Sequence, residues 1–413
     1  MVLLRRSRVT GAHGAITTVG RMQNGIAVWM DQLSSVEIAQ DGTSAKIGGG
    51  TLSKTVIDTL WAAGKQTGKS YDPRSVYCLL GPGLGGGHGW LQGRYGLIAD
   101  QFLSVNIVLA NGSLQTVDED TDHDLWWALK GAGHNFGIVT SVTSKVFDIQ
   151  HNDWAYEMYI FTSDKVEGLY EALNSLLNDG SPPVDIVNYG FFLNNPVIDD
   201  KGPVTMLWIL QEGKTAVDSI YTKPFHDLKP TTIDVGSGTY LDLPRWTGMD
   251  NDAAPCQHVG LANNRYPIDI RSYNIQAMRQ AYDLFATATK ETPALNGSFF
   301  LIEGYPLRGV KSVPDDSTAF PFRGDNLLVA PVISWVPSGP EIAEKAARLG
   351  SELRRIIYES SGRKELHTYV NYASGDETTK NWYGYKRWRQ ERLLAVKNKY
   401  DPERKFSFYA PIG

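Results

Sequence analysis

The densest group of residues able to do chemistry is a glycine-rich run in the first quarter of the chain. It reads Gly81-Pro-Gly-Leu-Gly-Gly-Gly-His-Gly89 and continues to Gly93 and Gly96. Glycines leave peptide N–H groups free to line a concave surface that can bind a pyrophosphate. We therefore expect a nucleotide-binding loop. The alternative is a mobile surface loop, which the apolar neighbours Trp90 and Leu97 disfavour.

Two common phosphate-binding motifs fit this run poorly. It is not a Walker loop, because no Gly-Lys-Ser/Thr closes it. The spacing Gly81-x-Gly83-x-x-Gly86 matches a dinucleotide fingerprint, with Asp100 as the acid that should follow. That fingerprint requires a helix just after the glycines, which Gly93 and Gly96 would break. A Rossmann-type site is therefore the weaker interpretation.

Two further glycine sites flank this run in the sequence. They read Gly11-Ala-His13-Gly14 and Gly131-Ala-Gly133-His-Asn-Phe-Gly137. Each alone would predict a turn, and His13 alone a structural histidine. His88 and His134 have no carboxylate or cysteine at ligand spacing, so we expect no metal site.

Composition limits the classes of partner. The 413 residues include 40 Lys+Arg and 45 Asp+Glu, a net charge of −5, without a basic tract. We therefore expect neither nucleic acid nor a membrane as partner. The two cysteines cannot form a disulfide framework. The start of the chain is not typical of a signal peptide, and the compartment and the oligomeric state stay open.

The elements that must position these motifs follow from periodicity and turn residues. The first 150 residues predict short strands at 25–30, 45–48, 102–110, 113–117 and 137–147, with helices at 53–63 and 124–130. Asn111-Gly112 predicts a tight hairpin turn. Further on, we expect strands at 155–162, 186–193, 204–211, 299–305 and 327–335, and helices at 165–177, 272–287, 341–360 and 380–399. The pattern indicates an α+β protein whose second part is a sheet covered by helices.

The three glycine sites, in this order, resemble the FAD-binding domain of berberine bridge enzyme-like oxidases, in the vanillyl-alcohol oxidase class of flavoproteins. The similarity lies in the run from Leu84 to Asp100, in Val-Leu-Ala-Asn-Gly112 and in the run from Asp124 to Thr140. The C-terminal part also matches, at Tyr369-Val-Asn-Tyr372 and onward. The resemblance covers nearly the whole chain and is closest to the fungal secondary-metabolite branch.

The resemblance implies a fold and a cofactor. It implies a two-domain flavoprotein with a PCMH-type FAD-binding domain at 1–150, a substrate domain at 151–372 and a return to the FAD domain at 373–413. His13 stands where the family's histidine bonds covalently to the flavin. The other residues at matching positions, which would contact FAD, are Gly11, Ala12, Gly14, Gly81, Pro82, Gly83, Leu84, Gly85, Gly86, Gly87, His88, Gly89, Leu91, Tyr95, Gly96, Asp100, Gly133, His134, Asn135, Gly137, Ile138, Val139 and Asn371.

The chain departs from the family pattern in two places. Many members attach FAD a second time through a cysteine, but Arg74 occupies that position. Any covalent link should therefore be single, through His13. The family also has some 50–60 residues before the histidine motif, where this sequence has twelve. Either the chain was cut or mis-started, or the FAD domain lacks its N-terminal part.

The activity implied is oxidation of a small organic molecule, a secondary metabolite, by proton abstraction and hydride transfer to FAD, with O₂ as acceptor. Tyr369 is the candidate base, held as a partial phenolate by nearby cations, and Tyr372 is the second candidate. The alternative for both is a tyrosine that packs the core. The alternative for the function is a redox-neutral cyclase or isomerase in the same pocket, with weak or absent flavin binding.

Overall fold

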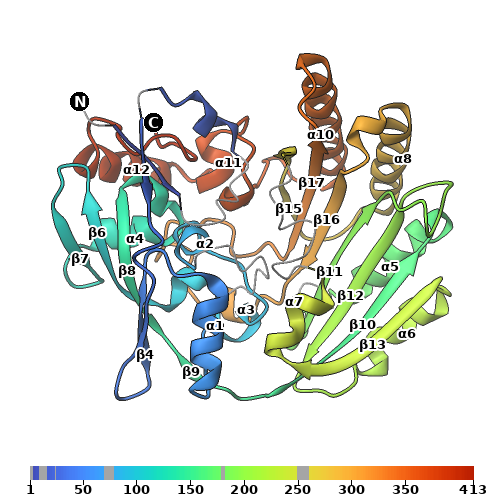
Figure 1. Cartoon of the computed structure of the whole chain (residues 1–413), viewed down its shortest axis with the longest axis horizontal. Coiled ribbons are helices and arrows are strands. Elements are labelled where there is room, and N and C mark those ends of the chain that lie inside the picture. Colours follow the sequence, from blue (N-terminus) through green and yellow to red (C-terminus); the bar gives the residue numbers. More distant parts are fainter. Residues whose placement is uncertain (1–2, 9–15, 24, 69–78, 178–181, 249–259) are drawn as a thin grey trace.

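The computed structural model describes residues 3–8, 16–23, 25–68, 79–177, 182–248 and 260–413. They form two lobes that lie side by side in Figure 1. The first lobe contains the early strands together with the C-terminal helices α11 (Thr379–Tyr383) and α12 (Arg387–Tyr400). The second lobe contains the middle of the chain. Segments far apart in the sequence therefore share one lobe.

The first lobe is built on a five-stranded antiparallel sheet. Its order is β3 (Val36–Ile38), β4 (Ser44–Gly48), β8 (Gly137–Lys145), β6 (Phe102–Leu109) and β7 (Leu114–Val117). The expected hairpin between β6 and β7 is confirmed, with Gly112 at φ +84°. Helices α1 (Ser53–Ala62), α2 (Leu80–Leu84) and α4 (His123–Ala132) pack with this sheet around one core. Two small pairs complete the lobe, β1 (Leu3–Arg8) with β2 (Gly25–Trp29) and β5 (Lys65–Gln66) with β9 (Phe147–Asp148).

The second lobe is built on an eight-stranded sheet. Its order is β13 (Thr232–Thr239), β10 (Asp153–Phe161), β12 (Val204–Glu212), β11 (Ile186–Leu193), β16 (Phe299–Gly304), β17 (Leu327–Trp335) and β14 (Ala262–Arg265), and β15 (Ile268–Ile270) also pairs with β17. Helices α5 (Val166–Ser175), α6 (Ser219–Asp227), α8 (Ile275–Glu291) and α10 (Pro340–Ser360) lie along its outer face (Figure 1). The predicted sheet covered by helices is confirmed.

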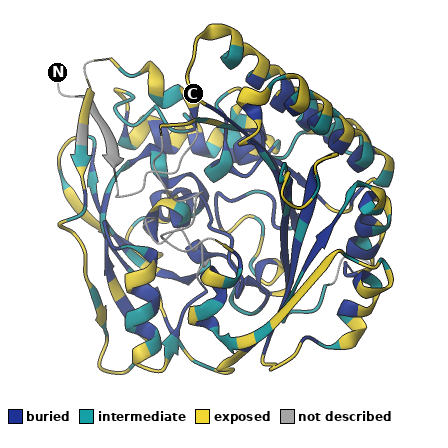
Figure 2. Cartoon of the chain, turned by 45° about the vertical axis from the view of Figure 1, so that its right-hand side comes forward, coloured by how far each residue is buried: buried dark blue, intermediate teal, exposed yellow. Residues whose placement is uncertain are grey.

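Both faces of the large sheet are covered. Every residue of β17 is buried, and Figure 2 shows the central strands in dark blue while the helices outside them carry the exposed residues. Leu327 and Val329 pack with the outer helices, whereas Leu328 and Ala330 face the first lobe. A strand that is buried on both faces has a continuous apolar sequence. The run of apolar residues in β17 therefore predicted a strand although apolar and polar residues do not alternate in it.

Strand register places one row of side chains on the inner face of this sheet. Leu328 of β17 lies opposite Asp269 on one side and Glu303 on the other. Glu303 in turn lies opposite Tyr189, and Tyr189 opposite Trp208. Directly opposite residues of antiparallel strands point to the same face. The row therefore presents two carboxyl groups and two aromatic rings toward the first lobe.

The structure corrects one predicted helix and adds elements that the pattern missed. The single helix expected at 380–399 is wrong, because Gly384 adopts φ +87° and Lys386 is extended, so the chain forms α11 and then α12. Strands β13, β14 and β15 were not predicted. β13 is mostly exposed and contains two glycines, so its sequence lacks an apolar period.

Candidate active site

The candidate site lies where the inner face of the large sheet meets the glycine run and the C-terminal segment. An apolar group joins the two lobes here, which we call the inter-lobe cluster. Its members include Trp90, Leu91, Leu97, Tyr189, Trp208, Leu301, Tyr305, Phe320, Leu328 and Tyr369. The short helices α3 (Gln92–Tyr95) and α9 (Arg308–Lys311) pack against each other beside it.

The glycines of the run allow close approach to other parts of the protein. A Cβ atom on Gly85 would lie 2.2 Å from Oδ1 of Asn371, and one on Gly86 would lie 2.4 Å from the ring of Phe320. Gly86 and Gly87 also adopt φ values of +99° and +81°. A side chain at Gly85 would push Asn371 away, and one at Gly86 would push Phe320 away.

Tyr369 is held by hydrogen bonds from both lobes. Nδ2 of Asn371 donates to its Oη at 2.6 Å and to the carbonyl of Pro82 at 2.9 Å, while the backbone N–H of His88 donates to the same Oη at 3.2 Å. The two donors lower the pKa of Tyr369, but burial raises it more, and the net pKa is above the usual value. The phenol proton meets no acceptor among the described residues, so it is available to a bound molecule.

Glu303 connects two more phenols on the inner face of the sheet. The hydroxyl of Tyr305 donates to Oε1 at 3.0 Å and that of Tyr372 donates to Oε2 at 3.0 Å. The guanidinium of Arg265 lies 5.0 Å from the ring centre of Tyr372. Sequence reasoning missed Glu303, although a carboxylate inside the apolar strand Phe-Phe-Leu-Ile-Glu-Gly304 is a usable signal. The cation expected near Tyr369 lies instead beside Tyr372.

His88 is buried against aromatic rings next to these groups. Its ring centre lies 4.6 Å from that of Tyr369, 5.4 Å from Tyr305 and 5.7 Å from Phe320. Its Nδ1 lies 2.9 Å from Oε1 of Gln92. Burial lowers the pKa of His88 to about 4, so the imidazole is neutral near neutral pH.

The structure brings only part of the predicted set together. Nε2 of His134 lies 3.2 Å from the carbonyl of Gly81, and Asn371 bonds to both Pro82 and Tyr369. The predicted residues that lie together are Gly81–Gly89, His134, Tyr369, Asn371 and Tyr372. Gly11, Ala12, His13 and Gly14 lie outside the described residues.

Other predicted residues make contacts within the protein. Asp100 forms a bidentate ion pair with Arg323 at 2.7 and 3.0 Å, and Tyr95 stacks on Phe147. Asn135 holds the C-terminal segment through Tyr383, Ala410 and Ile412. Gly137, Ile138 and Val139 pair with β6, Gly133 packs against Leu84, Gly96 lies next to Asp100, and Leu91 is buried in the inter-lobe cluster.

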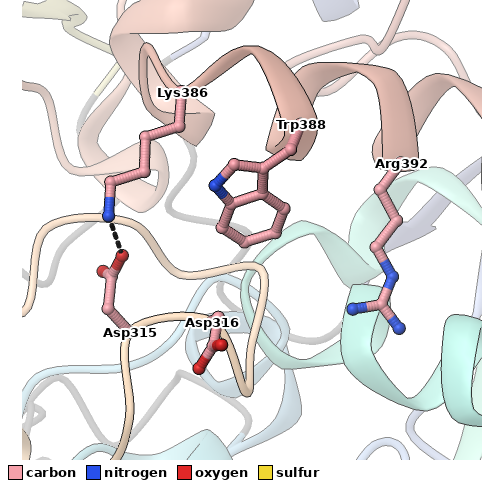
Figure 3. A pocket seen from close by; sticks show the side chains of 5 residues that line it. All are labelled: Asp315, Asp316, Lys386, Trp388 and Arg392. Atoms are coloured by element: carbon pink, nitrogen blue, oxygen red, sulfur yellow. Dashed lines mark hydrogen bonds and ion pairs between the residues drawn. The ribbon is translucent and has the colours of Figure 1, made fainter.

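A pocket of about 460 Å³ lies outside this site, near the start of α12. It is lined by Asp315, Asp316, Lys386, Trp388 and Arg392 (Figure 3). Lys386 pairs with Asp315 at 2.7 Å, and Arg392 pairs with Asp124 at 2.9 Å. Both cations already have protein partners, so neither is a free positive charge for an external anion.

Comparisons with known proteins identify the family. Residues 7–118 match a family model described as FAD binding domain, and residues 368–413 match one described as berberine and berberine like. The FAD-linked oxidoreductase chyH of Penicillium rubens is 53% identical over 405 residues, which cover 97% of this chain and 80% of that protein. The chain belongs to the berberine bridge enzyme-like FAD-linked oxidoreductases. The FAD-linked oxidoreductase chry5 of Gibberella zeae is 50% identical over 403 residues, 97% of this chain and 79% of that protein.

Solved structures of the berberine bridge enzyme-like family show the same two-domain fold. BBE-like 1 of Physcomitrella patens superposes with a TM-score of 0.80 at 22% identity, over 98% of this chain and 85% of that one. The xylooligosaccharide oxidase of Myceliophthora thermophila gives a TM-score of 0.79 at 21% identity, with the same coverage. Among the described residues, none of the helices is both long and apolar enough to cross a bilayer.

The cofactor of this oxidoreductase is FAD, and the described residues fit it. A Cβ on Gly81 would meet no atom of the described residues within 4 Å, so the start of the glycine run faces space that these residues leave open. Beside it, Nδ1 of His134 is buried and has no hydrogen-bond partner among the described residues. A buried polar atom without a partner, next to open space, suits a polar ligand that supplies the missing hydrogen bond.

Proposed function

We propose that this oxidoreductase oxidises a small, hydroxyl-bearing secondary metabolite, with O₂ as the electron acceptor. The observation that carries the proposal is the environment of Tyr369, a buried phenol whose Oη receives two N–H donors. Those donors stabilise a phenolate, and the phenol sits between the two lobes beside the open start of the glycine run. A tyrosine that only packed the core would not need both donors.

FAD, when bound, supplies the oxidising chemistry, taking a hydride from the substrate and passing electrons to O₂. Tyr369, once it has lost its own proton, accepts the proton of the substrate hydroxyl. Asn371 and the His88 N–H stabilise the phenolate before that transfer, after which the negative charge lies on the substrate oxygen. Glu303 fixes the hydroxyl of Tyr372, the second candidate base, at 3.0 Å. Residues Gly81–Gly87, His134 and Asn371 would hold the cofactor, and His13 would bond to it covalently.

An absorbance spectrum taken before and after acid precipitation tests this proposal. Yellow colour in the precipitate is expected, because a covalent bond survives denaturation. In His13→Ala the colour should move to the supernatant. Colour in the wild-type supernatant would remove the covalent bond from the proposal.

The same preparation separates oxidation from redox-neutral chemistry. We expect O₂ consumption and a product two electrons more oxidised than the substrate. Family membership as an FAD-linked oxidoreductase does not favour the redox-neutral alternative. A colourless protein that FAD cannot reconstitute, giving a product of unchanged oxidation state, would contradict the oxidase proposal.

A further inference from the structure

His88 carries a polar atom that the chemistry above does not use. The residue is only 7% exposed, and its Nδ1 is bonded to Gln92. Its second ring nitrogen, Nε2, makes no hydrogen bond to any described residue. Nε2 is not among the side-chain atoms that are sealed from solvent without a partner, so water or a bound molecule can reach it.

Gln92 determines which nitrogen of His88 carries the proton. Nε2 of Gln92 donates to the carbonyl of Pro306 at 3.2 Å, and its Oε1 accepts from the N–H of Gly89 at 3.1 Å. These two bonds fix the orientation of the amide, with its oxygen toward His88. An amide oxygen only accepts, so the proton of the neutral imidazole lies on Nδ1. Nε2 therefore carries a lone pair.

The contacts of the ring show what this lone pair faces. The Nδ1 edge is turned to α3, so the Nε2 edge points away from that helix. The ring contacts Tyr369, Tyr305 and Phe320, which all belong to the inter-lobe cluster. Burial keeps the pKa of His88 near 4, so its protonation does not remove the acceptor at neutral pH.

We propose that Nε2 of His88 accepts a hydrogen bond from a hydroxyl group of an aromatic substrate. The inference rests on the proposed function, since it places a substrate between the lobes. The surrounding rings suit a planar molecule, and the lone pair selects one with a hydroxyl donor. A molecule that fills the same space without the hydroxyl would leave Nε2 buried and unpaired, and would bind more weakly.

Binding of p-cresol and 4-methylanisole to the FAD-containing protein tests this. The two probes differ only by methylation of the hydroxyl, and quenching of tryptophan fluorescence reports their dissociation constants. We expect p-cresol to bind about tenfold more tightly, as one hydrogen bond predicts. In His88→Phe, which keeps a ring and removes both nitrogens, the preference should fall to about twofold or less. His88→Leu replaces it if that variant does not retain FAD.

Phe320→Leu is the matched control. It trims another ring beside His88 but removes no polar atom, so both affinities should weaken together and the preference should remain. Equal affinity of the wild type for both probes, or a preference that survives in His88→Phe, would overturn the inference. Binding requires no turnover. An intact preference in a protein without oxidase activity would therefore contradict only the proposed function.

Discussion

Tyr369 depends on one hydrogen-bond donor that is near it in the sequence and one that is distant. Asn371 is two residues away, but His88 is 281 residues away, and both reach the same phenol oxygen. The donors favour the phenolate, whereas burial opposes it. Tyr369 can therefore accept a proton only after its own phenol proton has left, a loss that the two donors favour and burial opposes.

Replacing Tyr369 by Phe should lower kcat by about 10²-fold or more, the range expected for loss of a general base. The ring still fills its site, so FAD content, measured by absorbance, should stay the same. Tyr409→Phe is a control, because its hydroxyl donates only to the carbonyls of Val370 and Asn371. An unchanged kcat in the Tyr369 variant would remove this residue from the mechanism.

Glu303 should set the pH at which Tyr369 becomes active. The negative charge of Glu303 raises the pKa of Tyr369. Glu303→Gln removes that charge, so the pKa of the base falls and the acidic limb of the kcat/KM profile should move to lower pH. Glu157→Gln removes a carboxylate from the outer face of the same sheet, where it contacts His226, and should leave the limb in place. A shift to higher pH in the Glu303 variant would contradict this assignment.

Residue types predicted part of the candidate site. Tyr369 and Asn371 follow from a resemblance in local sequence, and the structure places them against the glycine run. Glu303 and Gln92 depend on which strands and helices are neighbours, and that information is nonlocal. Asp100 is the opposite case: its spacing from the glycines predicted a contact with the cofactor, but its carboxylate is bonded to Arg323, 223 positions away.

At the scale of the elements, α10 packs closely on the large sheet. A Cβ on Gly350 would lie 2.0 Å from Cε2 of Tyr266, so the helix rests on that ring. Gly350→Ala improves helix propensity by about 1 kcal/mol. We expect the clash to outweigh this gain, with a net loss of about 1–3 kcal/mol in the free energy of unfolding.

Urea unfolding measures this loss, with Ser351→Ala as the control. Ser351 is the exposed neighbour on the same helix, and its substitution should change stability by less than about 0.5 kcal/mol. A Gly350→Ala protein more stable than the wild type would show that α10 shifts away from Tyr266 without cost.

Long elements with a strong period were predictable, and breaks within them were not. α8 and α10 each keep one apolar face, and β16 and β17 are apolar runs. The break at Gly384 has a local cause, the positive φ of that glycine, but the flanking residues favour helix on both sides. Helix propensity therefore predicted one continuous helix where the fold has two, α11 and α12.

At the scale of the molecule, ion pairs connect the two lobes. Arg94 of α3 pairs with the buried Glu212 of β12 at 2.6 Å, and Asp100 pairs with Arg323. We propose that the lobes correspond to an FAD domain of residues 1–150 and 373–413 and a substrate domain of 151–372. The core of the first lobe includes Val146, Trp382 and Ile412, as this division requires, and it also includes Ala319 and Val370 from the proposed substrate domain.

Acid should destabilise the whole protein through its buried neutral histidines. The pKa of His88 is about 4 when folded, against 6.5 for an ordinary histidine. Between these values the unfolded state binds the extra proton, so stability is full above about pH 6.5 and falls as the pH drops toward 4. At pH 5 the loss from His88 is about 2 kcal/mol.

Urea unfolding of the wild type and of His88→Phe at pH 7 and pH 5 measures this term. The variant should lose about 2 kcal/mol less than the wild type over that interval. Equal losses would show that His88 is solvated or paired when folded.

The C-terminal return has a consequence for biosynthesis. Apart from Ala319, the core of the first lobe contains residues from Ile16 to Val146 and then from Val370 to Ile412. A ribosome adding roughly 5–20 residues per second takes roughly 10–45 s to travel from Val146 to Val370. Throughout that interval the nascent lobe exposes the apolar surface that α11 and α12 will cover. The growing chain is therefore a substrate for chaperones, and the lobe closes only after residues 370–412 have been synthesised.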